Sequence, residues 1–136
     1  MKLKIVLISC VSKKKEHSSK AHDLYISALF KKNLQYAFKL NPDKIFILSA
    51  KYGLVSLDDE IEPYDLTLNS MSAGEIRKWA KGVLHQLSEK TDLQFDQFIF
   101  LAGEKYRKHL IPYLAHFEVP MAGLRIGEQL HRLGEE

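Results

Sequence analysis

The sequence predicts an α/β fold in which helices cover both faces of a mostly parallel sheet, giving three layers. Three short, nearly continuous apolar runs indicate buried parallel strands, Lys4–Ser9, Lys44–Leu48 and Phe95–Leu101. The segments between them are long enough for the helical crossovers that parallel strands require. With 136 residues, the chain is expected to form one domain over residues 1–136.

The first strand and the first helical region are separated by a polar segment. Val11–Lys20 contains three consecutive lysines and is predicted to be a loop. Apolar residues then recur at helical spacing over Ala21–Leu40, and Ser27 is a candidate N-cap that would divide this region into a short turn and a main helix. Residues 41–43 contain a proline and end the helix.

A long segment without clear periodicity follows the second strand. Ala50–Asn69 carries Gly53 and Pro63, and it is predicted to be a loop. A loop of this length inside a compact domain is usually functional.

The next helix has a strong start signal. Either Ser70 or Ser72 could open it, and Glu75 lies three residues after Ser72, as a capping box requires. The apolar spacing continues to about Lys90, before the third strand.

The last third of the chain is less regular. Glu104–Phe117 is predicted to be helical, with Pro112 either kinking or splitting the helix. Glu118–Met121 is a candidate short fourth strand, and Gly127–Leu133 is expected to form a short helix.

Composition narrows the class of protein. The chain is 46% hydrophobic and 27% charged, with a net charge of +3, which permits an anionic partner without requiring one. The single cysteine, Cys10, excludes an internal disulfide and a multi-cysteine metal site. Without a signal peptide or an apolar run near 20 residues, the sequence predicts a cytoplasmic protein that does not associate with membranes.

The carboxyl ends of the predicted strands indicate where a site would lie. In parallel sheets ligands bind beyond these ends, and here each end is followed by small or polar residues and then by lysine. The candidate binding residues are Ser9, Cys10, Lys13, Lys14 and Lys15 after the first strand, Ser49, Lys51, Tyr52 and Gly53 after the second, and Gly103 after the third.

The lysine-rich loop has two interpretations. Lys13, Lys14 and Lys15 could bind phosphate as mobile point charges, or they could form a solvated loop that contacts nothing. The loop contains no glycine, so it does not match a Walker phosphate-binding motif.

The turn after the second strand also has two interpretations. Gly53 permits a positive φ, so the backbone could approach a ligand while Tyr52 stacks on a base. The alternative is a tight turn whose tyrosine packs on the core. The position at a strand's carboxyl end favours the functional interpretation.

Asp65 is the candidate catalytic residue. It follows Tyr64, and its carboxylate could act as a general acid or base or could accept hydrogen bonds from a base or sugar. It could equally bond the local backbone in an Asx turn.

Other polar residues give weaker signals. Tyr25 could reach the site or pack in the core, and Cys10 is more typical of a buried inert thiol than of a nucleophile. The acidic residues Asp58–Glu60 and Glu62 match no ligand spacing, so we predict no metal and no other cofactor.

Several of these segments together resemble known families. Leu48–Val55, followed by Leu57-Asp58, Ile61, Pro63-Tyr64 and Leu66, resembles the central signature of the YaaA-like peroxide-stress proteins. Asp23–Phe30 and the Leu-Ser-Ala-Lys-Tyr-Gly-Leu run are similar to small bacterial domains and to proteins associated with modified 7-deazaguanine bases, including archaeosine synthase. The resemblance implies a uracil-DNA-glycosylase-like fold and a link to DNA or nucleobases.

Three functions are then open. The first is an enzyme acting on a nucleobase or its N-glycosidic bond, in which Tyr52 or Tyr64 stacks on the base and Asp65 orients water or a sugar hydroxyl. The second is a non-catalytic protein that binds DNA or nucleotides in a stress response. The third is a small-molecule sensor or an accessory protein that binds a partner.

Overall fold

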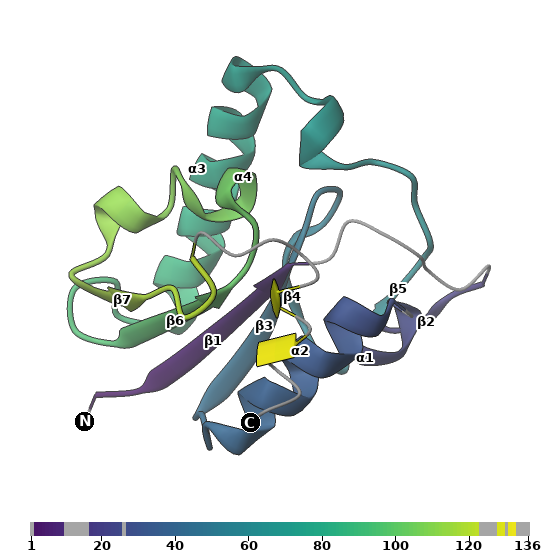
Figure 1. The fold of residues 1–136 in the computed structure, drawn as a ribbon. Coiled ribbons are helices and arrows are strands. Elements are labelled where there is room, and N and C mark those ends of the chain that lie inside the picture. The colour runs from purple at the N-terminus through teal and green to yellow at the C-terminus, as the bar shows by residue number, and fades with distance from the viewer. Residues whose placement is uncertain (1, 10–16, 26, 123–127, 130, 133–136) are drawn as a thin grey trace.

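A five-stranded sheet forms the centre of the computed structural model, which describes residues 2–9, 17–25, 27–122, 128–129 and 131–132. The strand order is β4-β3-β1-β6-β7, and β4 alone runs antiparallel to its neighbour, β3 (Figure 1). The strands span Lys4–Ser9 for β1, Lys44–Ser49 for β3, Gly53–Ser56 for β4, Gln97–Leu101 for β6 and His116–Glu118 for β7. The predicted α/β class with a mostly parallel sheet is confirmed.

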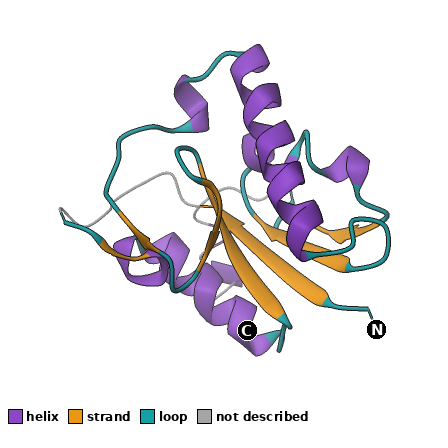
Figure 2. Cartoon of the chain, turned by 180° about the vertical axis from the view of Figure 1, so that it is seen from behind, coloured by secondary structure: helices purple, strands orange, loops and turns teal. Residues whose placement is uncertain are grey.

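Helices cover both faces of this sheet (Figure 2). The helices α1 (Ala21–Leu24) and α2 (Ala28–Lys39) pack on one face, and α3 (Ala73–Lys90) packs on the other. Successive side chains of β1 alternate between the two cores: Ile5 and Leu7 face α3, whereas Val6 and Ile8 face α2. This alternation explains why the strand is apolar throughout.

The break between α1 and α2 occurs at the predicted cap. The Ser27 Oγ accepts a hydrogen bond from Phe30 N at 3.2 Å, which satisfies a free N–H of the first turn. Asn41 follows the end of α2 with φ of +53°, the left-handed conformation common just past a helix. The predicted boundaries of this region are confirmed.

The prediction of an irregular loop over residues 50–69 was wrong in its first half. After a turn, Gly53–Ser56 returns along β3 as β4, because Gly53 has φ of +75° and Leu54 and Val55 bury their side chains. The two-residue strand β5 (Glu60–Ile61) then pairs with β2 (Ser19–Lys20), and a 3₁₀ turn, η1, spans Leu68–Ser70.

The third predicted strand begins two residues later than expected. Before Gln97, the Asp92 Oδ1 accepts hydrogen bonds from Gln94 N at 3.0 Å and Phe95 N at 3.1 Å. This Asx turn holds the backbone out of the extended conformation and leaves Phe95 48% exposed.

The helical region predicted for residues 104–117 is split, which is one of the two effects expected of Pro112, and only part of it is helical. The chain forms α4 (Glu104–Arg107) and a separate 3₁₀ turn, η2 (Ile111–Tyr113), with Pro112 near its start. Proline cannot donate the N–H that a continuous α-helix needs, so the helix is split rather than kinked. The last strand, β7, spans His116–Glu118 and shares only Glu118 with the predicted strand over 118–121, most of which was therefore wrong.

Two predictions are tested only in part. Residues 128–129 and 131–132 are helical, within the short helix expected at 127–133. Within the described residues, no helix combines the length and the apolar character needed to cross a membrane.

Candidate functional site

A chain of three hydroxyl groups fixes the carboxyl end of β3. Ser49 is fully buried, and its Oγ donates to the Tyr64 Oη at 2.8 Å and accepts from Tyr52 N at 3.0 Å. The Tyr64 Oη lies 2.7 Å from the Tyr25 Oη. Residues from three separate segments are thereby joined at one point, which sequence order alone could not show.

The tyrosine rings form a cluster around the same point. The ring of Tyr64 contacts Tyr25 edge-on at 6.4 Å between centroids and Tyr52 at 5.8 Å. The ring of Tyr25 packs in the core, because the residue is only 1% exposed. Its hydroxyl lies beside that of Tyr64 at the end of the chain of hydroxyl groups. Tyr64 is half-buried and its hydroxyl is bonded to Ser49 beside that of Tyr25, and its predicted stacking on a base stays a prediction.

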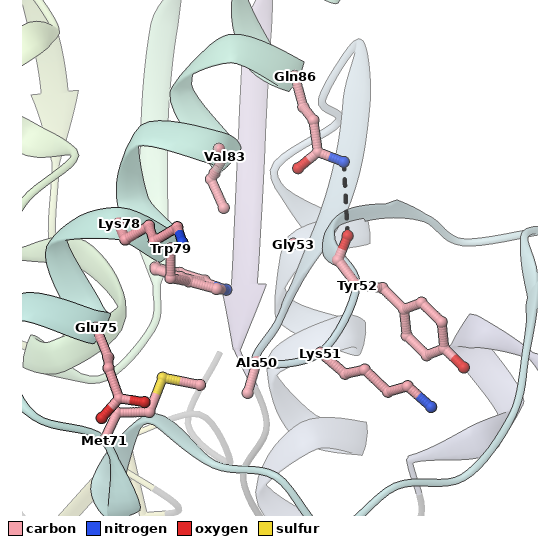
Figure 3. A pocket seen from close by; sticks show the side chains of 11 residues that line it. Ala50, Lys51, Tyr52, Gly53, Met71, Glu75, Lys78, Trp79, Val83 and Gln86 are labelled. Carbon is pink, nitrogen blue, oxygen red and sulfur yellow. Dashed lines mark hydrogen bonds between the residues drawn. The ribbon is translucent and has the colours of Figure 1, made fainter.

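The turn after β3 is held from the side by α3. The Gln86 Oε1 accepts from Leu54 N at 2.9 Å, and its Nε2 donates to the Tyr52 carbonyl at 3.5 Å (Figure 3). A Cβ added at Gly53 would overlap the Gln86 Oε1, and the φ of +75° is unfavourable for other residues. Glycine at position 53 therefore gives both the turn and its contact with the helix.

Trp79 is the site residue that the sequence analysis missed. Its Nε1 donates to the Ser49 carbonyl at 2.9 Å, and its ring contacts Tyr106 edge-on at 5.6 Å between centroids. The spacing along α3 places Trp79 on the apolar face, which typically indicates a core residue. The usable signal was its place near the start of α3, beside the strand ends.

A cleft of about 460 Å³ separates α3 from the turn after β3. Trp79 and Met71 extend toward it, whereas the side chains of Lys51 and Tyr52 point away from Trp79 (Figure 3). The Tyr52 ring packs against the core on the α2 face of the sheet, so only the Tyr52 backbone belongs to the turn beside the cleft. The Lys51 Nζ lies 5.2 Å from the centroid of the Tyr52 ring, and Lys51 and Lys78 are exposed. The lining residues are Ala50, Lys51, Tyr52, Gly53, Met71, Glu75, Lys78, Trp79, Gly82, Val83 and Gln86. This cleft, defined by those residues, is called the tryptophan cleft below.

The one carboxylate of the tryptophan cleft is engaged in capping α3. The Glu75 Oε1 accepts from Ser72 N at 3.0 Å, and the Ser72 Oγ accepts from Glu75 N at 3.2 Å, which confirms the predicted capping box. These bonds from the backbone and side chain of Ser72 lower the pKa of Glu75, so the group stays ionised near neutral pH. An ionised cap is poorly suited to act as a general acid.

A second cavity, of about 440 Å³, lies beyond the end of β6. Its lining residues are Asn69, Gly103, Glu104, Lys105, Tyr106 and Lys108. The predicted residues Ser9 and Gly103 meet beside it, because the Ser9 Oγ accepts from Gly103 N at 3.1 Å. Two of the three predicted strand ends are thus joined directly.

Asp65 stands apart from both cavities. Its side chain is exposed, lines neither cavity, and has no hydrogen-bond or ion-pair partner in the described part of the chain. The predicted catalytic role of Asp65 stays a prediction.

The other candidates after β1 lie outside the described residues: Cys10, Lys13, Lys14 and Lys15. Among the residues that are described, no group of three or more His, Cys, Asp or Glu side chains is placed to hold a metal ion.

Comparison with known proteins identifies the family. Residues 5–135 match a family of unknown function, DUF6884. The chain belongs to this family. A search of curated proteins found no match. Because the description of DUF6884 carries no activity, a function for this member has to be argued from the site itself.

Proposed function

We propose that the tryptophan cleft binds a nucleobase carried by a nucleotide or nucleic acid. The observation that supports this most directly is Trp79, whose half-buried indole lines a cavity large enough for a small planar ligand. Its hydrogen bond to the Ser49 carbonyl and its contact with Tyr106 fix the ring before any ligand arrives. A preoriented aromatic surface of this kind binds bases by stacking, whatever their sequence.

The charge at the cleft favours anionic ligands over free bases. Lys51 and Lys78 are exposed lining residues, and neither forms an ion pair with a described residue, so with the ionised Glu75 they leave a single positive charge at the cleft. Such lysines raise the local concentration of phosphate-bearing molecules and speed their association. The likeness of residues 48–66 to YaaA-like proteins, and of residues 23–30 and 48–54 to proteins associated with 7-deazaguanine bases, supports the same class of ligand.

Release of the base by hydrolysis of its N-glycosidic bond is a second proposal, on a uracil-DNA-glycosylase-like scaffold. It is favoured by the position of Asp65 directly after Tyr64, which is itself fixed by Ser49. Against it, Asp65 does not line the tryptophan cleft, and the carboxylate that does, Glu75, is engaged as a helix cap. Binding is therefore the function that the geometry supports better.

Trp79 provides the test of binding, because it is the only tryptophan in the chain. Titration with nucleobases, nucleosides and nucleoside monophosphates should change its fluorescence in a saturable way. Calorimetry should then show that Trp79→Ala weakens binding by roughly tenfold or more, as expected when one stacking contact is lost. The matched control is Phe38→Ala, which removes a 59% exposed aromatic ring from α2, on the opposite face of the sheet. Unchanged affinity in folded Trp79→Ala would exclude stacking at this cleft.

Mass spectrometry tests the second proposal. Incubation with nucleosides, RNA, and single- or double-stranded DNA should release a free base if the protein is a glycosylase. Asp65→Asn should abolish that release while leaving the ligand affinity intact. Ligand binding without any released base would exclude the glycosylase proposal and support binding as the only function of the two.

A further inference from the structure

We propose that the second cavity, beyond the end of β6, is an anion subsite that binds a phosphate group of the ligand held in the tryptophan cleft. This inference rests on the proposed binding of a base at Trp79. It adds a separate group of residues and a chemical class for the rest of the ligand, a phosphate ester.

The side chains of this cavity suit an anion. Lys105, Lys108 and Asn69 supply ammonium and amide N–H donors, and in the described structure none of the three side chains has a hydrogen-bond or ion-pair partner. Free donors around a cavity of this size are available to a ligand without first breaking contacts within the protein. Lysine serves phosphate as a point charge and needs no fixed geometry.

The cavity is adjacent to the tryptophan cleft. Tyr106 lines the second cavity and Trp79 lines the first, and their rings touch at 5.6 Å between centroids. The segment that contains η1 borders both cavities, since Asn69 within η1 lines the second cavity and Met71, just past η1, lines the tryptophan cleft. In a nucleotide the phosphate is one sugar away from the base, so a base on Trp79 brings its phosphate toward Lys105 and Lys108.

The hydroxyl of Tyr106 helps to fix the position of the second cavity relative to the tryptophan cleft. It accepts a hydrogen bond from Leu68 N at 3.4 Å, which ties η1 to α4. Tyr106 is only 3% exposed, so this contact is shielded from water. The lysines are thus attached to a part of the chain whose position relative to Trp79 is fixed.

Glu104, which also lines this cavity, should repel an anion. Its substitution therefore tests the direction of the expected change in affinity. The carboxylate of Glu104 lies at the same cavity, so two lysines and one glutamate leave a single positive charge there. If phosphate binds here, Glu104→Gln removes a repulsion and should raise its affinity. If the cavity binds no phosphate, Glu104→Gln should leave the affinity for the phosphate-bearing ligand unchanged.

The experiment compares a nucleoside with its monophosphate on the full chain, followed by Trp79 fluorescence. The monophosphate should bind the wild-type protein more tightly. Replacing Lys105 and Lys108 together with alanine should remove that advantage, roughly fivefold to tenfold, and leave the nucleoside affinity unchanged. The control is Lys31→Ala with Lys39→Ala, which removes the same charge from exposed positions on α2. Thermal melting confirms that both double variants fold.

Binding of a short single-stranded oligonucleotide distinguishes a phosphate of a nucleic-acid strand from the phosphate of a free nucleotide. A loss confined to the oligonucleotide assigns the subsite to a strand phosphate, and a loss shared with the monophosphate assigns it to a nucleotide; both support the subsite. Equal binding by the Lys105/Lys108 variant and the control would overturn the subsite while leaving base binding in place. If the wild-type protein bound none of the three ligands, both the subsite and the proposed function would be overturned.

Discussion

The two ends of the parallel sheet use polar residues in different ways. At the amino end, the Asp43 Oδ2 accepts from Lys4 N at 2.8 Å, and the buried Asp96 accepts from Leu3 N and Asp92 N, both at 2.9 Å. At the carboxyl end, lysines line two cavities without ion pairs to described residues. The polar groups at the amino end hold the backbone together, whereas the carboxyl end combines groups that fix the backbone, such as Ser49 and Ser9, with exposed lysines that are available to a ligand.

This difference shows how position along a strand sets the role of a charged residue. A carboxylate beside the first residues of neighbouring strands meets backbone N–H groups that have no partner within the sheet. Beyond the last residues of β6, the Arg107 guanidinium donates to the Ala102 carbonyl at 2.7 Å, whereas the lysines that line the two cavities are exposed and form no ion pair with a described residue. The comparison leads us to expect that changes at the amino end alter stability alone, whereas changes at the carboxyl end also alter binding.

The largest effect is expected for Asp96→Ala. Both carboxylate oxygens of this 3% exposed side chain accept backbone N–H groups, so the substitution leaves two donors without partners. Hydrogen bonds to charged groups contribute about 1.5–3 kcal/mol each, and we expect a loss of about 3 kcal/mol in the free energy of unfolding. Chemical denaturation measures the loss, and ligand affinity should be unchanged in the folded fraction.

Asp65→Asn is the matched control for Asp96→Ala. Asp65 is exposed and has no partner in the described part of the chain, so its substitution should leave the denaturation midpoint where it is. Comparable losses in both variants would mean that the loss in Asp96→Ala does not come from its two backbone hydrogen bonds.

A smaller loss in the free energy of unfolding, of about 2 kcal/mol, is expected for Gly53→Ala at the carboxyl end of the sheet. The left-handed φ costs a residue with a Cβ about 1–2 kcal/mol, and the Cβ would also displace Gln86 from Leu54 N. Gly82→Ala provides a control of opposite sign, because Gly82 is an exposed residue inside α3 with open space around it. It should gain up to about 1 kcal/mol from helix propensity. A gain in both variants, measured by thermal melting, would show that the turn tolerates a side chain.

Each single substitution in the chain of hydroxyl groups should lower the free energy of unfolding by about 1 kcal/mol. Tyr64→Phe removes the partner of Ser49 and Tyr25, and Ser49→Ala removes the partner of Tyr64 and Tyr52. Because one hydrogen bond is common to both, the double variant should lose less than the sum of the two. Tyr113→Phe, at a 57% exposed ring, should change nothing. Strict additivity in a denaturation cycle would mean that Ser49 and Tyr64 act independently.

The sequence was sufficient where neighbours along the chain determine the structure. The Ser27 cap, the Ser72–Glu75 capping box and the positive φ of Gly53 all depend on contacts or backbone preferences within a few residues. The three buried strands were visible because a strand covered on both faces is apolar at every position.

Predictions from the sequence failed where the deciding partner is distant. The strand β4 is four residues long and is recognisable only beside β3. The role of Trp79 depends on the Ser49 carbonyl, 30 residues away, and that of Asp96 on Leu3 N, 93 residues away. Spacing along one helix or strand carries no information about such partners, so the polar residues that join the strand ends could be suspected but not paired.

The smallest expected effect concerns Glu75, at the edge of the tryptophan cleft. Its pKa is lowered from the ordinary value of 4.5 by hydrogen bonds from Ser72, so the ionised form stabilises the folded state. The sign follows from linkage: this contribution is present above pH 4.5 and is lost as the pH falls through the lower pKa of the folded protein. Glu75→Gln should therefore melt slightly below the wild type at neutral pH, since an amide oxygen can still cap, and the difference should vanish in acid. Glu60→Gln, an exposed carboxylate without a side-chain partner in the described structure, should show no such convergence. A difference that grew as the pH fell would mean that the neutral form of Glu75 is the better cap, contrary to the lowered pKa.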